Sequence, residues 1–309
     1  MPEIASGAPH MLPENIGSSC PPEMHSALAR YLAGEISGEL ALMHFVVALR
    51  QAEALAATLE SLASLKPGCK EISDLVRLSQ VHADDLTRVA GIVQRGLMDL
   101  PSAVDDGVAF IANQFDKAVA TAPEASVALY SLGSTEILDR ATSEILARLT
   151  EWKLLAPECV VLDLGCGIGR FERALAPHVG KVIGIDVSPG MIAEARRRCS
   201  DLTNVVLNVC DGRDLASFDD RSLDLVLAVD SFPYLVAADP ALAARHVSDA
   251  ARLLRPGGAL LILNFSYRGN SDVDRSDVAR LASEYRFVLE RAGTRDFALW
   301  DGVTFLLRK

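Results

Sequence analysis

Residues 159–171 read CVVLDLGCGIGRF, and this stretch decides the fold of the chain. Its first half is a short run rich in Val and Leu, typical of a strand that is buried on both faces. The glycines at positions 165, 167 and 169 follow this strand and lead straight into a helical stretch. Glycine lets the backbone turn tightly and approach a ligand, and the N-terminus of the next helix offers unpaired N–H groups. The stretch therefore predicts a strand, a ligand-binding loop and a helix in succession.

Strands and helices continue to alternate after this loop. Further short apolar runs predict strands, and helical stretches separate most of them. The predicted strands are 159–164, 181–186, 204–209, 223–229 and 259–263, and the predicted helices are 134–152 with Ser134 as N-cap, 170–176, 189–199 and 241–254. This alternation predicts an α/β fold with a doubly wound, mainly parallel sheet, which we expect to have seven strands.

The C-terminal part breaks the alternation. Phe297–Trp300 and Val303–Leu307 flank Asp301-Gly302, which is a two-residue hairpin signal. We therefore expect an antiparallel C-terminal hairpin at the edge of the sheet. The pattern of residues 287–291 fits either a strand or the end of a helix.

A smaller all-α domain is predicted before the sheet. Between residues 24 and 97 apolar residues recur every three or four positions, and the break at Lys66-Pro67-Gly68 predicts a helical hairpin. We interpret the stripe that contains Met43 and His44 as ordinary core packing, without a catalytic role. The predicted domains are a flexible tail at 1–22, rich in Pro, Gly and Ser, a helical domain at 23–105 and a second domain at 106–309.

Charge and hydropathy exclude several classes of function. The 309 residues include 30 Lys and Arg against 41 Asp and Glu, and the net charge of -11 repels nucleic acids and anionic lipids. The longest apolar run, Leu40–Leu49, is far shorter than the roughly 20 residues that cross a bilayer. The first residues have neither a basic start nor an apolar signal segment. We expect a cytoplasmic protein without nucleic-acid or membrane partners.

The cysteines give no sign of a metal centre. They stand at positions 20, 69, 159, 166, 199 and 210, without a CxxC pair or a His/Cys ligand spacing. A reducing cytoplasm keeps such cysteines as thiols, so we expect neither disulfides nor a metal site.

An acidic residue strengthens the prediction of a ligand site. Asp186 ends the second predicted strand, 21 residues after Gly165, where its carboxylate can accept hydrogen bonds from the hydroxyls of a ribose. The glycine spacing is G-x-G-x-G rather than the G-x-G-x-x-G of nicotinamide-dependent dehydrogenases. The sequence therefore predicts an adenosine site and disfavours a dehydrogenase.

Five stretches in sequence order resemble the motifs of class I S-adenosylmethionine-dependent methyltransferases. They are Val161–Phe171, Gly184–Met191, Cys210–Gly212, the strand that ends at Asp230, and Leu254–Gly258. The resemblance spans about residues 110–309, and it implies a seven-stranded Rossmann-like fold with S-adenosylmethionine as cofactor. The N-terminal helical domain resembles no family that we recognise.

The resemblance also implies roles for individual residues. Asp163 would hold the amino group of the methionine part, Asp186 the ribose, and Asp211 the exocyclic amine of adenine, while Met191 would pack on the adenine ring. Taken alone, Asp211 is equally typical of a turn and Met191 of a core. The other expected cofactor contacts lie in the same motifs: Gly165, Cys166, Gly167, Gly169, Val187, Gly212 and Asp230. Cys166 occupies a variable slot of the loop.

The acceptor of the methyl group is expected where predicted strands four and five end, because open α/β sheets bind ligands at that edge. Tyr234 and Tyr267 follow these two strands and are candidate catalytic residues. His246, on the next helix, is a candidate general base, although such a position is more typical of a surface histidine. The segment from Asp230 to Tyr234 is one residue longer than the (D/N)PPY motif of nucleic-acid amine methyltransferases, so we do not assign that activity.

The resemblance therefore predicts an enzyme that transfers methyl from S-adenosylmethionine to a small-molecule acceptor by in-line displacement. Two alternatives stay open: a regulatory protein that binds the cofactor without turnover, and a protein methyltransferase. The N-terminal helices would act as a lid, a homodimer contact or a specificity element.

Overall fold

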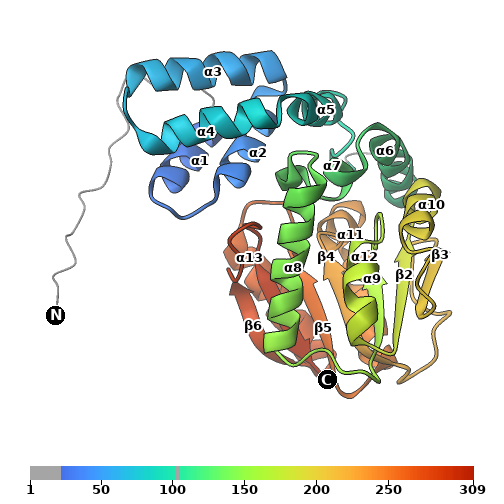
Figure 1. Ribbon diagram of the computed structural model, residues 1–309. Coiled ribbons are helices and arrows are strands. Elements are labelled where there is room, and N and C mark those ends of the chain that lie inside the picture. Colours follow the sequence, from blue (N-terminus) through green and yellow to red (C-terminus); the bar gives the residue numbers. More distant parts are fainter. Residues whose placement is uncertain (1–21, 102–104) are drawn as a thin grey trace.

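The computed structural model describes residues 22–101 and 105–309, so nearly all of the predicted tail lies outside the described residues. A group of helices lies over one end of a sheet that is covered by helices on both faces (Figure 1). Among the described residues, no helix is long and apolar enough to cross a membrane.

The sheet confirms the predicted architecture. Its seven strands lie in the order β3-β2-β1-β4-β5-β7-β6. Strands β1 to β5 are parallel, and β7 is antiparallel to both of its neighbours, β5 and β6. The bounds are β1 Val160–Leu164, β2 Lys181–Asp186, β3 Val205–Val209, β4 Leu223–Val229, β5 Leu254–Leu263, β6 Val288–Thr294 and β7 Thr304–Arg308.

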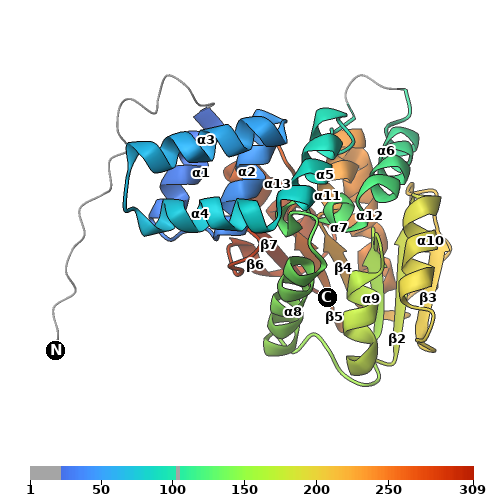
Figure 2. The same ribbon diagram turned by 45° about the horizontal axis from the view of Figure 1, so that its top comes forward.

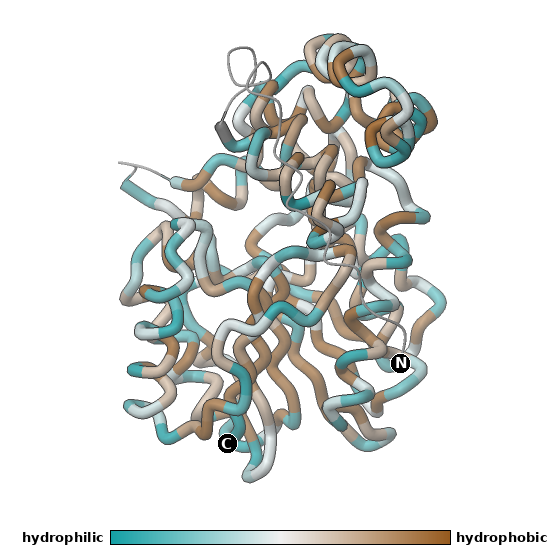
Figure 3. Tube along the Cα trace, turned by 90° about the vertical axis from the view of Figure 1, so that its left-hand side faces the viewer, coloured by the Kyte–Doolittle hydropathy of each residue, from teal (hydrophilic) through white to brown (hydrophobic). Residues whose placement is uncertain are grey.

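Successive strand residues point to opposite faces and build two apolar clusters. Val161 and Leu225 belong to the cluster that includes the buried face of α8, whereas Leu162 and Val226 belong to the cluster with α12 and α13. Coloured by hydropathy, the strands form the apolar centre of the molecule (Figure 3). The helices of this part are α6 Gly107–Thr121, α7 Pro123–Val127, α8 Thr135–Glu151, α9 Arg170–Leu175, α10 Pro189–Arg198, α11 Phe232–Ala238, α12 Pro240–Leu253 and α13 Ser271–Glu284.

The predicted helical hairpin at the N-terminus is wrong, because the segment forms five short helices (Figure 2). The break at residues 66–68 is confirmed, but the chain also turns at Gly34, whose φ is 73°, and at Arg50, whose φ is 58°. The Ser37 side chain caps the second helix by accepting from Leu40 N at 3.3 Å. The helices are α1 Pro22–Leu32, α2 Gly38–Leu49, α3 Ala52–Leu65, α4 Lys70–Val81 and α5 Ala83–Gln94.

The antiparallel C-terminal hairpin exists, but its first strand was placed wrongly. Residues 288–294 form that strand, whereas 297–300 lie in the loop between β6 and β7. There the N–H groups of Ala298 and Leu299 donate to the Glu144 carboxylate of α8, at 2.7 and 3.0 Å. The Glu144 side chain thus satisfies backbone groups that a neighbouring strand would otherwise pair. Trp300 of the same loop lines a cavity at the end of the sheet.

Candidate functional site

Parallel strands bring their carboxyl ends to one edge of the sheet, and a cavity of about 670 Å³ opens there. Its wall contains Gly165 and Asp186 from the ends of β1 and β2, and Asp230 and Asn264 from the ends of β4 and β5. Helices that precede the sheet complete the wall: α2, α6, α7 and the short 3-10 helix at Leu129–Ser131. One cavity therefore joins both predicted halves of the site.

The glycine loop is shaped by close packing. Gly165 and Gly167 have φ values of 80° and 55°, a region that favours glycine. A Cβ on Gly165 would lie 2.7 Å from the Ser231 Cβ, and one on Gly167 would lie 2.5 Å from a methyl carbon of Val127. Gly165, Cys166 and Gly167 line the cavity, while Gly169 packs against Ala195 of α10 instead.

Asp186 fastens this loop to the next one. Its Oδ2 accepts from Gly167 N and its Oδ1 from Ser188 N, both at 2.9 Å. The residue is 8% exposed, and burial raises the pKa of its carboxyl to about 6. It ends β2 and lines the cavity.

Asp163 lies behind the loop, outside the cavity wall that the described residues form. Neither Asp163 nor Glu172 of α9 has a hydrogen-bond partner for its carboxyl oxygens within the described chain. Burial raises the pKa of Asp163 to about 7, and burial together with the nearby charge of Asp163 raises the pKa of Glu172 well above its usual value. Sequence reasoning missed Glu172; the absence of a Cβ at Gly184, beside its Oε1, makes room for it.

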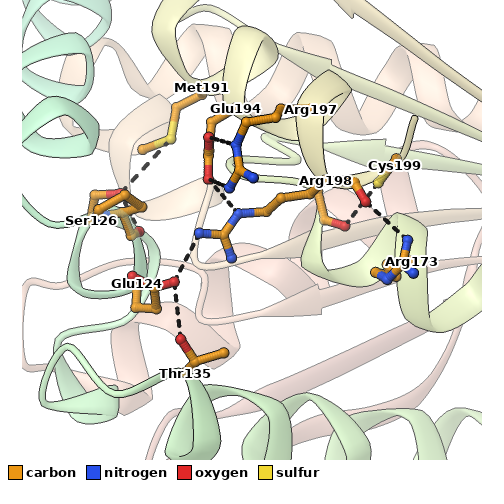
Figure 4. A network of polar contacts seen from close by, with 11 residues as sticks. Glu124, Ser126, Thr135, Arg173, Met191, Glu194, Arg197, Arg198 and Cys199 are labelled. Carbon is orange, nitrogen blue, oxygen red and sulfur yellow. Dashed lines mark hydrogen bonds and ion pairs between the residues drawn. The ribbon is translucent and has the colours of Figure 1, made fainter. Parts of the chain in front are cut away.

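Three further predicted cofactor contacts line the cavity beside Asp186: Val187, Met191 and Gly212. Met191 is buried, and its sulfur accepts from the Ser126 hydroxyl of α7 at 3.9 Å (Figure 4). Asp211 behaves differently. Its side chain is exposed, accepts from Arg213 N at 2.9 Å, and is not part of the wall formed by the described residues.

An ion-pair network joins α7 to α10 (Figure 4). Arg198 of α10 contacts Glu124 of α7 at 2.8 Å and Glu194 of its own helix at 2.6 Å. Hydrogen bonds from Arg197 and Arg198 lower the pKa of Glu194 to about 2, so the Glu194 carboxylate stays negatively charged at neutral pH. Val127 and Ala128, which follow Glu124 in the chain, belong to the cavity wall.

The acceptor end is built around Asp230, which lines the cavity at the end of β4 with a φ of 56°. Its carboxylate accepts from Asn264 at 2.6 Å, the Tyr267 hydroxyl at 3.0 Å and the Trp300 indole N–H at 2.9 Å. The Tyr234 ring packs edge-on against Tyr267, with ring centroids 6.0 Å apart. The structure thus brings both predicted tyrosines together.

His246 is buried, only 1% exposed, so the expectation of a surface position is wrong. Its Nδ1 lies 2.9 Å from the Leu242 carbonyl oxygen, and burial lowers the pKa of the ring. Because a carbonyl only accepts, Nδ1 carries the hydrogen of the neutral ring. The side chain lines the cavity, and Nε2 has no partner in the described part of the chain.

The stripe at Met43 and His44 is not ordinary core, because both residues line the cavity. His44 Nε2 lies 3.0 Å from the Asp301 carboxylate, which also accepts from Arg30 at 3.3 Å. The three residues connect α1 and α2 to the loop between β6 and β7. Helical periodicity identifies such a buried face but cannot tell a cavity from a core.

Other cavity residues escaped the sequence analysis. Trp300 comes from the loop that was predicted as a strand, and Tyr130, whose hydroxyl accepts from Arg170 at 3.0 Å, comes from the short helix before α8. Arg170 directly follows the last glycine of the loop and could have been found as a charged residue at a helix start. Neither aromatic residue stands in a motif.

Comparison with known proteins assigns the central part of the chain. Residues 161–258 match a family described as a methyltransferase domain. A demethylmenaquinone methyltransferase of Tropheryma whipplei is 38% identical over 114 residues, which is 35% of this chain and 42% of the relative. A 2-methyl-6-phytyl-1,4-hydroquinone methyltransferase of Synechocystis sp. is 34% identical over 120 residues, 38% of this chain and 36% of the relative. The chain thus spans less than half the length of these two curated relatives.

Solved structures share the fold. Phosphoethanolamine N-methyltransferase 1 of Haemonchus contortus, in complex with phosphoethanolamine and S-adenosylhomocysteine, has a TM-score of 0.52 at 17% identity and covers 65% of this chain and 48% of its own. Magnesium protoporphyrin IX methyltransferase from Synechocystis, with bound S-adenosylmethionine, has a TM-score of 0.50 at 17% identity. The match covers 68% of this chain and 100% of the solved chain. With the motifs, the strand order and the family match, the chain contains a methyltransferase domain of the class I S-adenosylmethionine-dependent type.

Proposed function

We propose that this chain transfers a methyl group from S-adenosylmethionine to a small-molecule acceptor by in-line displacement. The observation that carries the proposal is that one cavity is lined by both parts of the site. The glycine loop and Asp186 line one end, and the cluster around Asp230 lines the other. A cofactor bound along the loop would present its methyl group toward that cluster. Such a site needs to hold the two reactants in line and to exclude water.

The residues at the loop end fit the cofactor. Gly165 and Gly167 leave backbone space that a Cβ would fill, and Asp186 is a buried acceptor suited to ribose hydroxyls. Val187 and Met191 offer apolar contacts for an adenine ring. The bound cofactor supplies an electrophilic methyl group on a sulfonium, and the protein binds and orients it.

The acceptor is held at the other end. Burial raises the pKa of the Tyr234 and Tyr267 hydroxyls above the ordinary value, so both stay protonated at neutral pH. They serve as hydrogen-bond donors and aromatic walls rather than as bases. Trp300 and Asn264, both fixed on Asp230, complete this wall.

Two observations favour a small acceptor. The two curated relatives are named for the methylation of small molecules, demethylmenaquinone and 2-methyl-6-phytyl-1,4-hydroquinone. In this chain, Met43, His44 and Val47 of α2 line the same cavity and thus limit its size on the side away from the sheet. The proposal therefore stands ahead of a protein methyltransferase and of a regulatory protein without turnover.

A labelling experiment separates these three functions. The purified protein is incubated with methyl-labelled S-adenosylmethionine and cell extract, and the extract is then divided into small molecules and protein. We expect label in the small-molecule fraction, and none with an Asp186→Ala variant. Label in a protein band would establish protein methylation, and bound but untransferred cofactor would establish the regulatory alternative.

We also propose a cytoplasmic location and a homodimer formed through the N-terminal helices. Leu65 of α3 and Val81 of α4 are large apolar side chains that are 52% and 72% exposed, and a dimer contact that buries them would be stabilised by removing this apolar surface from water. Sedimentation velocity of the wild type and of a Leu65→Lys, Val81→Lys variant tests the dimer. A monomeric wild type would contradict it.

A further inference from the structure

Helix α12 packs along the loop that joins β3 to β4, residues 210–222. Leu215 N donates to the Asp249 carboxylate at 2.9 Å, and Arg252 donates to the carbonyl oxygens of Leu215 and Phe218 at 3.0 and 2.8 Å. Arg221 N in turn donates to the Arg252 carbonyl oxygen at 3.1 Å. Leu215 thus pairs with Asp249, and the later loop residue Arg221 pairs with Arg252 at the end of the helix. The earlier part of the loop therefore lies beside the earlier part of α12.

This arrangement places His246 beside the beginning of the same loop. His246 precedes Asp249 by three residues, so the two side chains share a helix face. The charged groups that act on the ring are Asp249 and Arg245 of its own helix and Asp214 of the loop. Cys210 and Gly212, which open the loop, line the cavity together with His246. His246 therefore belongs to the β3 end of the cavity.

The ring presents an acceptor there. Its Nδ1 donates to the Leu242 carbonyl oxygen at 2.9 Å, which leaves Nε2 with a lone pair. Nε2 is buried without a hydrogen-bond partner among the described residues, although buried polar atoms are nearly always paired. A ligand with an N–H or O–H group at this place would satisfy it.

The adenine ring of the cofactor is such a ligand. Gly212 packs against Val187, and a Cβ on Gly212 would lie 2.5 Å from a methyl carbon of Val187. Both residues follow strands at the Asp186 end, where the proposed function puts the nucleoside. Asp211, the expected partner of the adenine amine, is turned to solvent and accepts from Arg213 N instead.

Resting on the proposed function, we infer that His246 Nε2 accepts a hydrogen bond from the exocyclic amine of adenine. His246 is then a residue that recognises the base of the cofactor, and neither a general base for the acceptor nor a purely structural histidine. His246, on α12, thus makes the hydrogen bond to the adenine amine that the motif suggests for Asp211. The chain would consequently distinguish an adenosyl from an inosyl ligand, because inosine carries a carbonyl oxygen in place of the amine.

Calorimetric titration with S-adenosylhomocysteine and S-inosylhomocysteine tests the inference. We expect the wild type to prefer the adenosyl compound by about tenfold or more, the usual effect of leaving a buried partner unpaired. His246→Leu should reduce this preference to about one. His246→Gln, whose amide can also donate to the inosyl oxygen, should bind both compounds and controls for loss of folding. Asp211→Asn should keep the wild-type preference.

The outcomes separate the inference from the proposed function. If the wild type binds neither compound, the proposed function fails. If it binds S-adenosylhomocysteine but the preference survives in His246→Leu, or disappears in Asp211→Asn, the proposed function stands and the assignment of His246 is wrong. A His246→Leu variant with unchanged preference and a reduced rate of methyl transfer would identify His246 as a base.

Discussion

The two ends of the cavity are built in different ways. The loop end consists largely of backbone from consecutive residues, with Asp186 accepting from Gly167 N and Ser188 N. The acceptor end consists of side chains that converge on Asp230 from the segment after β5 and from the loop before β7, up to 70 residues away. A cofactor that many enzymes share thus constrains a short, contiguous segment, whereas an acceptor site can be assembled from dispersed residues. Four predictions test this contrast.

The largest effect is expected at the loop end, from Asp186→Ala. The change removes the acceptor of two backbone N–H groups and the expected ribose ligand, so affinity for S-adenosylhomocysteine should fall at least about a hundredfold in calorimetry. Asp272→Ala, which removes an 89% exposed carboxylate on α13, is the matched control and should bind as the wild type does. Unchanged affinity in Asp186→Ala would refute the loop end as the cofactor site.

Gly167→Ala should have the next largest effect. The position has a φ of 55°, and the new Cβ would lie 2.5 Å from Val127, so both backbone strain and overlap distort the loop. We expect about tenfold weaker cofactor binding and a melting temperature lower by about 3 to 6 °C. Adding Val127→Ala removes the overlap and should restore part of the loss, measured by calorimetry and thermal unfolding. No rescue would show that Val127 does not limit the loop.

A smaller and more selective effect is expected at the acceptor end from Trp300→Phe. The substitution keeps an aromatic ring but removes the indole N–H that donates to Asp230 at 2.9 Å. The rate of methyl transfer should fall about fivefold, typical for one lost hydrogen bond, while S-adenosylhomocysteine affinity stays within about twofold. Trp152→Phe, at the end of α8, serves as control. Equal losses of both quantities would erase the distinction between the two ends.

Glu172→Gln should affect cofactor binding least, because Glu172 lies behind the loop. Burial raises the pKa of Asp163 from 3.8 to about 7 and raises that of Glu172, so the folded chain holds more protons than the unfolded chain between these values. The free energy of unfolding therefore falls as the pH rises from about 4 to about 7. Urea unfolding at pH 5 and pH 8 should show a smaller fall in the variant than in the wild type or in the exposed control Glu158→Gln. An equal fall in all three would contradict the assignment.

The sequence allowed most of the sheet to be predicted but little of the acceptor end. Parallel strands buried on both faces are continuous apolar runs, so β2 and β4 were placed at their observed ends. The loop at 295–303 was not predicted, because its N–H groups bond to Glu144, a partner more than 150 residues away. The five N-terminal helices were read as two for a related reason, since short turns at Gly34 and Arg50 do not interrupt the apolar period.

Site residues could likewise be predicted where they stand in a local motif and not where distant segments bring them together. Gly165, Gly167 and Asp186 were named from local spacing, and the structure brings them together in one wall. Trp300, Tyr130 and His44 stand in no motif, because their place depends on how the helices before the sheet and the loop before β7 fold over its edge.

The most direct test of the account is a pair of titrations on the wild-type protein, one with S-adenosylhomocysteine and one with NADH, followed by calorimetry and thermal unfolding. At about 100 times its dissociation constant, a specific ligand adds about 2.7 kcal/mol to the free energy of unfolding, which raises the melting temperature of a chain of this size by roughly 4 °C. We expect this shift with S-adenosylhomocysteine and none with NADH. A shift with NADH alone, or with neither ligand, would contradict it.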